Sequence, residues 1–214
     1  MSFTIILVIM TGVISYQAFN NPVMRQKLIF HPASVKNNGE WYRFITHGFI
    51  HANWGHLLIN LFVLWQFGEV IESFFNSALF GKAFGKILFL VLYLSAIIIA
   101  GIPAYIRHQN NNYYASLGAS GATSALVLAY IMLNPWGWFL FPPLPALLVG
   151  IGYLWYSSYM TKHGADNIAH DAHLWGAVYG LAFMIVATMV ARPELLDFYL
   201  QQLLAGPTPP PFIQ

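Results

Sequence analysis

The chain has 214 residues, of which 58% are hydrophobic and only 7% are charged. Soluble domains are about half apolar and about a quarter charged, so this composition excludes a soluble enzyme and a disordered chain and indicates a polytopic membrane protein. The net charge of +2, with scattered basic residues and no cysteine, excludes a nucleic-acid partner, disulfide bonds and Cys-ligated zinc.

Six apolar segments have about the length that a membrane-spanning helix needs. A helix crosses ~30 Å of hydrocarbon in about 20 residues, with a range of roughly 17 to 25. The sequence therefore predicts an all-α polytopic fold with six spans, forming a single domain over residues 1–191. The predicted spans cover residues 2–19, 54–75, 84–106, 117–133, 144–160 and 172–191.

The segments outside these spans differ in character. The first span has no Lys or Arg before its apolar run, so we expect a retained span and not a signal peptide. The long first connection, residues 20–53, mixes charged residues with apolar clusters, which favours a location in the membrane interface. The segment 192–214 ends in a Pro-rich run that is incompatible with a helix, and we expect an exposed tail there.

The directions of the spans bring four polar residues to one side of the membrane. Consecutive spans alternate in direction, so the second, fourth and sixth spans all start from the same face. His56 and Asn60 lie in the opening turns of the second span, while Ser120 and His173 open the fourth and the sixth. Polar side chains within a membrane usually face an interior cavity. The sequence therefore predicts a water-accessible polar pocket that enters the bilayer from one face.

Ser120 and His173 are the candidate nucleophile and general base of this pocket. A serine hydroxyl attacks poorly until a base takes its proton, and Ser120 lies in the small-residue segment 118–121. Small residues let two membrane helices approach closely, so tight packing of the fourth and sixth spans would bring hydroxyl and imidazole together. The sixth span carries a small-residue stripe with a spacing of four, formed by Ala172, Gly176 and Gly180.

The intermediate of acyl transfer also needs donors that are aimed at its oxyanion. The start of the fourth span offers free backbone N–H groups and the positive end of a helix dipole. His56 and Asn60, four residues apart on one helix face, offer a ring nitrogen and an amide. Asp171 points away from the face of His173, so we expect a Ser–His dyad and not a triad.

Other interpretations of these residues stay open at the level of sequence. A serine between small residues is usually a packing residue in a membrane helix, and a histidine at a helix start often makes only local hydrogen bonds. Imidazoles also bind zinc, copper and nickel, which permits a metal site or a metal transporter. Against the metal hypothesis, no His-Glu-x-x-His element is present and no span carries an acid near its middle. The histidines concerned are His47, His51, His56, His163, His170 and His173.

Three separated blocks resemble the rhomboid family of intramembrane serine proteases. The first runs from Trp41-Tyr42-Arg43 to Glu72, the second is the segment 118–121, and the third is 172–180. The resemblance implies a compact six-helix bundle of the bacterial type, in the bacterial cell (inner) membrane, with an active site open to the extracytoplasmic side. It implies structural roles for Arg43, Glu72, Gly118, Gly121, Gly176 and Gly180.

The same resemblance implies roles for the site residues. Ser120 would be the nucleophile, His173 the general base, and the oxyanion donors would be His56, Asn60 and the backbone N–H of Ser120. The implied reaction is cleavage of single-span or multi-span membrane proteins in the lipid bilayer, within or next to their transmembrane segments. No metal or organic cofactor is expected. An inactive rhomboid-like protein that binds clients is the alternative.

The chain departs from the family pattern in two ways. Many relatives carry a tyrosine four residues after the nucleophile, stacked on the catalytic histidine, and here that position is Ser124. Other groups, such as an aromatic ring elsewhere, would then hold His173. Family topology puts the N-terminus in the cytoplasm, which leaves three basic residues inside and six outside, the reverse of the positive-inside tendency.

Overall fold

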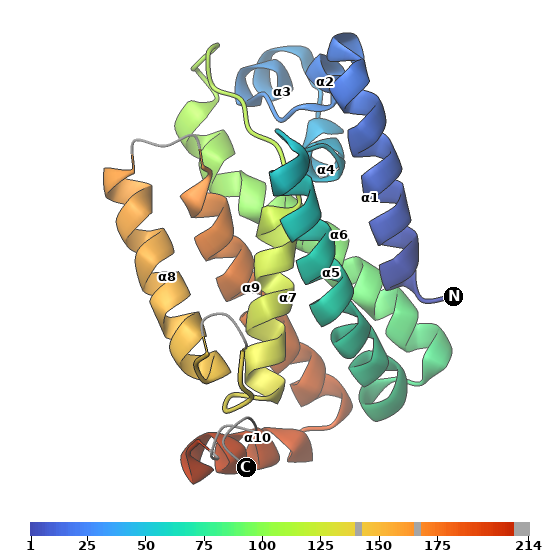
Figure 1. The fold of residues 1–214 in the computed structure, drawn as a ribbon, viewed down its shortest axis with the longest axis vertical. Helices are drawn as coiled ribbons and strands as arrows, with labels where there is room; N and C mark the ends of the chain where they lie inside the picture. Colours follow the sequence, from blue (N-terminus) through green and yellow to red (C-terminus); the bar gives the residue numbers. More distant parts are fainter. Residues whose placement is uncertain (140–142, 165–167, 208–214) are drawn as a thin grey trace.

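The computed structural model describes residues 1–139, 143–164 and 168–207. Within these residues, six long helices form a bundle, with short helices at both of its ends (Figure 1). Each predicted span coincides with one long helix, so the predicted all-α six-helix fold is confirmed. The long helices are α1 (Phe3–Asn20), α5 (Trp54–Phe74), α6 (Lys82–His108), α7 (Ser120–Leu133), α8 (Ala146–His163) and α9 (His170–Ala191).

The six helices differ in how well they match the bilayer. Four of them, α1, α5 with its π-helical extension to Leu79, α6 and α9, have the length and hydropathy of membrane spans. α7 has only 14 residues, about 21 Å at ~1.5 Å per residue, because the loop before it runs into the bundle (Figure 1). α8 has 18 residues but contains several tyrosines, serines and basic residues, which lower its hydropathy. The chain is an integral membrane protein.

The first connection folds into short helices at the end of the bundle where α5 begins. Arg43 is buried among them, and its Nη1 donates hydrogen bonds to the carbonyl oxygens of Gln26 at 2.9 Å and Ile29 at 2.7 Å. Its Nε also pairs with the carboxylate of Glu40. These bonds join three parts of the loop, and the structural role of Arg43 stays a prediction. The short helices are α2 (Pro22–Leu28), α3 (Pro32–Asn38), α4 (Arg43–Thr46) and the 3₁₀ helix η1 (His47–Phe49).

Glu72, buried near the far end of α5, binds the beginning of α1. Its carboxylate accepts hydrogen bonds from the backbone N–H of Phe3 at 2.9 Å and from the N–H and hydroxyl of Thr4, both at 2.8 Å. The first N–H groups of a helix have no partner within the helix, and a negative charge there also complements the helix dipole. Glu72 therefore joins α1 to α5 at the end opposite to Ser120.

α7 lies at the centre of the bundle, between α5, α6 and α9, and most of its residues are buried. Its contact with α9 is made backbone to backbone. A Cβ atom added at Gly176 would lie 2.1 Å from the carbonyl oxygen of Gly121, and one added at Gly180 would lie 2.2 Å from that of Ala125. Neither position has room for a side chain. The small-residue stripe of the sixth span is thus the surface that α7 packs on.

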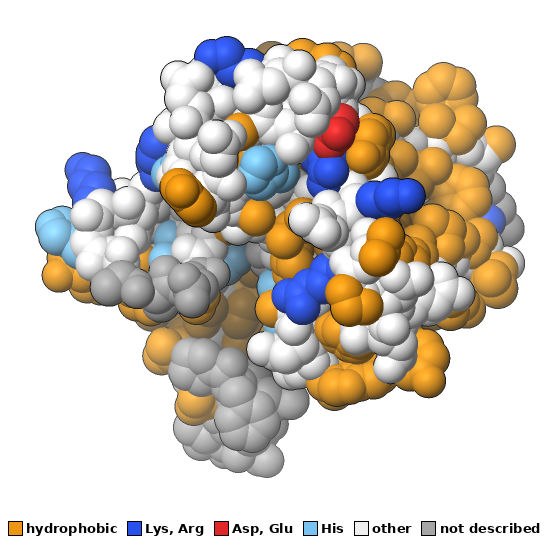
Figure 2. Space-filling model, turned by 90° about the horizontal axis from the view of Figure 1, so that it is seen from above, with side chains coloured by type: hydrophobic (Ala, Val, Ile, Leu, Met, Phe, Trp, Pro, Cys, Tyr) orange, Lys and Arg blue, Asp and Glu red, His pale blue; other side chains and the backbone are white. Residues whose placement is uncertain are grey.

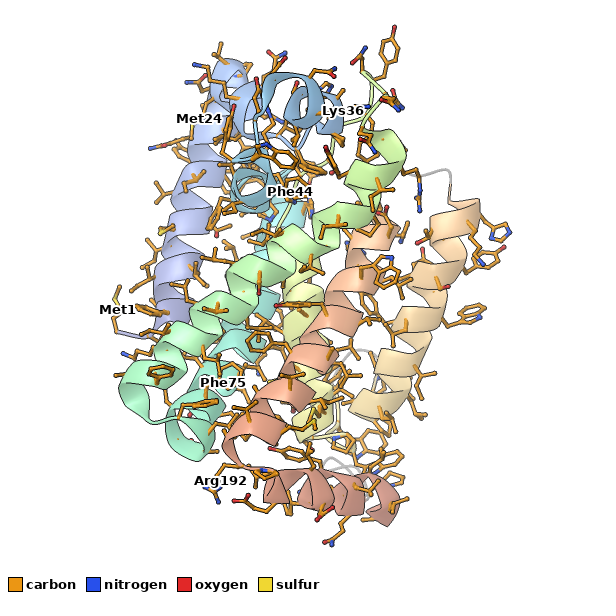
Figure 3. The ribbon with its side chains drawn as sticks, turned by 180° about the vertical axis from the view of Figure 1, so that it is seen from behind. Met1, Met24, Lys36, Phe44, Phe75 and Arg192 are labelled. Atoms are coloured by element: carbon orange, nitrogen blue, oxygen red, sulfur yellow. The ribbon has the colours of Figure 1, made fainter. Side chains whose placement is uncertain are left out.

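The C-terminal segment, expected as a tail, contains the helix α10 (Glu194–Ala205), which lies across the end of the bundle (Figure 1). Figure 3 shows Arg192, where the chain turns into α10, at the end opposite to Lys36 and Met24. The indole nitrogen of Trp136 donates to carbonyl oxygens near the end of α10, at 3.0 Å each. The sequence pattern does not predict this helix. The Pro-rich run after Pro207 and residues 165–167 of the connection before α9 lie outside the described residues.

Candidate active site

Ser120 is the first residue of α7, at the inner end of the loop that enters the bundle. The turn before it depends on Gly118, whose φ of +125° is rarely adopted by residues with a side chain. A Cβ at this glycine would also lie 2.6 Å from Cε1 and 2.9 Å from Nε2 of His56. The imidazole of His56 therefore lies directly against the turn that carries Ser120.

A chain of hydrogen bonds from α1 holds the same turn. The backbone N–H of Ala119 donates to Nε2 of the buried His51 at 3.3 Å. Because Nε2 accepts, the proton is on Nδ1, which donates to the hydroxyl of Ser15 at 2.9 Å, and this hydroxyl donates to the carbonyl of Phe49 at 2.8 Å. Burial, with a further contribution from His56, lowers the pKa of His51 to about 3. A neutral His51 thus positions the start of α7.

Asn60 lies in the second turn of α5, buried against α7. Its amide nitrogen donates to the carbonyl of His56 at 2.8 Å, and its amide oxygen accepts from the hydroxyl of Thr123 at 3.0 Å. These two bonds fix the orientation of the amide, and one of its two N–H hydrogens is left for another acceptor. His56, Asn60 and Ser120, which sequence analysis grouped by span direction, are thus brought together at the start of α7.

His173 lies in the first turn of α9 and is half-buried. The helix contact nearest to it joins Gly121 and Ala172, since a Cβ at Gly121 would lie 3.4 Å from the carbonyl oxygen of Ala172. That Cβ would also lie 2.4 Å from the Cβ of Ala100 on α6, so Gly121 has no room for a side chain. Ser120 is the neighbour of Gly121 in the chain, and His173 is the neighbour of Ala172.

The aromatic ring beside His173 comes from α8. The ring centroids of Tyr153 and His173 are 6.2 Å apart and their planes are inclined by 23°. The hydroxyl of Tyr153 lies 2.5 Å from Oγ of Ser124, the position at which many relatives have the stacking tyrosine. Sequence analysis left the identity of such a group open, because the pairing of Tyr153 with His173 depends on how α8 and α9 pack.

Asp171 has partners of its own, next to His173 in the chain. Its buried carboxylate accepts from the guanidinium of Arg107 at 3.4 Å and from the backbone N–H of Ala172 at 2.8 Å. The bond from Arg107 ties the start of α9 to the end of α6. Among the described residues, no group of three His, Asp or Glu side chains is arranged to hold a metal ion, so the metal hypothesis gains no support from the described part of the chain.

A small cavity of about 20 Å³ adjoins Ser120 and is lined in addition by His47, Ser116 and the loop before α7. A cavity needs roughly 10–15 Å³ to hold one water molecule, so this one has room for a single water beside the hydroxyl. Figure 2 shows the end of the molecule above the site, where Lys, Arg and His side chains gather. The site thus lies below a polar and predominantly basic face.

Comparison with known proteins gives consistent matches. A family model for the rhomboid domain matches residues 38–190. The chain is 29% identical over 175 residues to RHOMBOID-like protein 12, mitochondrial, of Arabidopsis thaliana, which covers 77% of this chain and 51% of that protein. It is 33% identical over 96 residues to the putative rhomboid protease YdcA of Bacillus subtilis, covering 45% of this chain and 43% of that protein.

A third relative is matched over most of its length. The chain is 28% identical over 178 residues to the rhomboid protease GlpG of Haemophilus influenzae, which covers 78% of this chain and 81% of that protein. The chain spans only about half the length of the plant and Bacillus relatives. The family model matches residues 38–190. This range includes every residue of the candidate site except Ser15 on α1.

Proposed function

Because the chain belongs to the rhomboid family of intramembrane proteases, we propose that it is a serine endopeptidase with a Ser120–His173 dyad. The observation that carries the proposal is the close packing of α7 on α9, where a Cβ added at Gly176 would lie 2.1 Å from the carbonyl oxygen of Gly121. Ser120 begins α7 and His173 lies in the first turn of α9. The close packing of the two helices therefore supports a hydrogen bond between the Ser120 hydroxyl and the His173 imidazole. The half-buried position of both residues supports access for a substrate.

In the proposed reaction, neutral His173 takes the proton of the Ser120 hydroxyl while the oxygen bonds to the substrate carbonyl carbon. The C–N bond then breaks, and His173 gives its proton to the leaving amine. A water molecule attacks the resulting ester with His173 again as base, which releases the new carboxyl group and restores Ser120. The cavity beside Ser120, with a volume of about 20 Å³, supports a water molecule at this place.

The proposed oxyanion donors are the backbone N–H of Ser120 and the side chains of His56 and Asn60. The contact of His56 with Gly118 supports this role, because it brings the imidazole to the turn that carries the nucleophile. The bonds from Asn60 to His56 and from Thr123 to Asn60 support a fixed amide with one N–H to spare. Removal of one such donor typically costs about 3 kcal/mol of transition-state stabilisation.

The proposed substrates are single-span or multi-span membrane proteins, cut within or next to their transmembrane segments. A regular helix shields its peptide bonds, so the segment must unwind locally before Ser120 can attack. Rhomboid proteases as a family act on membrane proteins within the bilayer. For this chain we propose the bacterial cell (inner) membrane as the location, and the proposed mechanism requires no metal or organic cofactor.

The proposal is tested by reconstituting the purified chain in liposomes with a model single-span substrate. We expect cleavage by the wild type and its loss in Ser120→Ala and in His173→Ala, because each variant lacks one member of the dyad. Ser77→Ala and His163→Ala are the matched controls, since Ser77 lies in the π-helical extension of α5 and His163 at the end of α8, both away from the site. Both controls should cleave at the wild-type rate.

Three outcomes would contradict the proposal in different ways. Full activity of Ser120→Ala or His173→Ala would exclude the dyad. Loss of activity on addition of a chelator would favour a metal mechanism. Binding of the substrate by the wild type without any turnover would favour an inactive rhomboid-like protein that binds clients.

A further inference from the structure

Tyr153, in the middle of α8, contacts both sides of the proposed dyad. Its ring is nearly parallel to the imidazole of His173, with 6.2 Å between the centroids, which lies within the range of offset aromatic pairs. Its hydroxyl lies 2.5 Å from Oγ of Ser124, one helical turn after Ser120. One side chain therefore lies beside the proposed base and is hydrogen-bonded, through Ser124, to the helix of the proposed nucleophile.

The directions of these hydrogen bonds follow from counting protons. The carbonyl oxygen of Ser120 has no proton, so the hydroxyl of Ser124 donates to it, at 2.6 Å. A serine has one hydroxyl hydrogen, so the bond between Ser124 and Tyr153 must use the hydrogen of Tyr153. The resulting chain runs from Tyr153 to Ser124 and ends at the carbonyl of Ser120. α8 is thus bonded to the peptide group of the proposed nucleophile.

A second tyrosine of α8 shows how this pairing arises. Tyr156, one turn after Tyr153, contacts His170, one turn before His173, with centroids 5.6 Å apart and planes inclined by 82°. From the first pair to the second, the residue number rises on α8 and falls on α9, as expected for neighbouring antiparallel helices. Tyr156 meets its histidine edge-on, whereas the ring of Tyr153 is nearly parallel to the imidazole of His173. Only Tyr153 combines the ring contact with the bond to Ser124.

We propose that Tyr153 is a positioning residue for the dyad and that Ser124 is its anchor on α7. This inference rests on the proposed function. The ring of Tyr153 limits rotation of the His173 imidazole, so that its nitrogen stays directed at the hydroxyl of Ser120. The bond to Ser124 fixes the position of the Tyr153 ring along α7, because a buried hydroxyl that loses its partner is unfavourable. The position of α8 therefore controls the alignment of base and nucleophile.

The test uses the purified chain in liposomes, with kcat and KM measured on a single-span substrate. We expect Tyr153→Leu to lower kcat by about 100-fold, as a small misalignment can do, and to leave KM unchanged. Tyr153→Phe keeps the ring and should lower kcat by only about 3- to 10-fold, as should Ser124→Ala. The double variant should lose no more than either single one, because both changes break the same chain of bonds.

Tyr156→Leu is the matched control, since it removes a tyrosine ring from the same helix, one that is paired with His170. We expect its kcat to stay within about twofold of wild type. Labelling of Ser120 by a fluorophosphonate provides a second measurement that does not need the substrate helix to dock. Its rate should fall in Tyr153→Leu and not in Tyr156→Leu. The melting temperature of each variant separates a loss of alignment from a loss of folding.

The outcomes separate this inference from the proposed function. If the wild type cleaves and Tyr153→Leu behaves like Tyr156→Leu, the positioning role is wrong and the proposed function stands. If the losses of Tyr153→Phe and Ser124→Ala multiply in the double variant, Ser124 is not the anchor. If the wild type neither cleaves nor reacts with the fluorophosphonate, the proposed function fails, and the inference fails with it.

Discussion

Two helix contacts beside the candidate site are built in different ways. α7 and α9 meet backbone to backbone, where a Cβ at Gly176 or Gly180 would lie 2.1 or 2.2 Å from a carbonyl oxygen. α8 meets α9 through pairs of tyrosine and histidine rings with centroids 5.6 and 6.2 Å apart. The first contact has no rotamers to change and allows one geometry, whereas the second can change by rotation of side chains. We infer that, in the proposed dyad, α9 sets the distance between Ser120 and His173 and α8 sets the orientation of the imidazole.

The largest expected effect comes from adding one methyl group to the glycine contact. Gly176→Ala should lower the free energy of unfolding by about 3 kcal/mol and abolish cleavage, because the new Cβ cannot fit without separating α7 from α9. The control is Gly152→Ala on α8, where no atom lies within 4 Å of the new Cβ. Thermal unfolding and cleavage assays measure both variants. Equal stability of Gly176→Ala and Gly152→Ala would show that α7 and α9 can move apart to accommodate a methyl group.

A smaller effect is expected from pH, because the buried imidazole of His51 accepts a hydrogen bond from the turn before α7. Burial lowers the pKa of His51 to about 3 and that of His47 to about 4, from the ordinary value of 6.5. As the pH falls, the two histidines take up protons in the unfolded chain before they do so in the folded chain. Their contribution to the free energy of unfolding is therefore present above pH 6.5 and is lost as the pH falls below 6.5. At pH 5 each histidine should cost about 2 kcal/mol, measurable by unfolding in detergent micelles.

A substitution of His51 isolates its share of this pH dependence. His51→Gln removes the titrating group, so the loss of stability between pH 6.5 and pH 5 should shrink by about 2 kcal/mol. His163→Gln, at an exposed position of α8, controls for the removal of a histidine. An unchanged pH dependence in His51→Gln would mean that other groups titrate on unfolding.

The smallest expected effect concerns the hydroxyl that orients Asn60. Thr123→Val keeps the shape of the side chain and removes the bond to the amide oxygen of Asn60, so kcat should fall by about 2- to 10-fold. Stability should change by about 1 kcal/mol or less, since the α7–α9 contact is untouched. Thr161→Val is the control, because the hydroxyl of Thr161 bonds only within α8, to Ser157. If Thr123→Val changes kcat more than KM, the hydroxyl of Thr123 acts by orienting Asn60 and not by binding the substrate.

The parts of the molecule that could be predicted from the sequence have local signals. Apolar segments of about 20 residues predict the six helices, and the spacing of Gly176 and Gly180 predicts a close helix contact, which α7 makes. The direction of the spans grouped His56 and Asn60 with the start of α7, since parity needs no knowledge of packing.

The parts that could not be predicted depend on the register between distant helices. Tyr153 is one of several tyrosines on α8, and only the packing of α8 on α9 selects it as the partner of His173. Ser15 and His51 are 36 residues apart, and nothing in either segment indicates their bond. Within α10 the helical pattern is short and is followed by prolines, so the segment reads as a tail.

The short length of α7 has a consequence for how the sidedness of this protein is assigned. α7 is enclosed by three other helices, so its length is not constrained by the thickness of the hydrocarbon. Hydropathy-based counting of crossings can therefore overlook it, and overlooking one crossing moves every later segment to the wrong compartment. Reporter fusions placed on both sides of α7 would give the crossing number directly. They would also decide which compartment the basic end of the molecule faces.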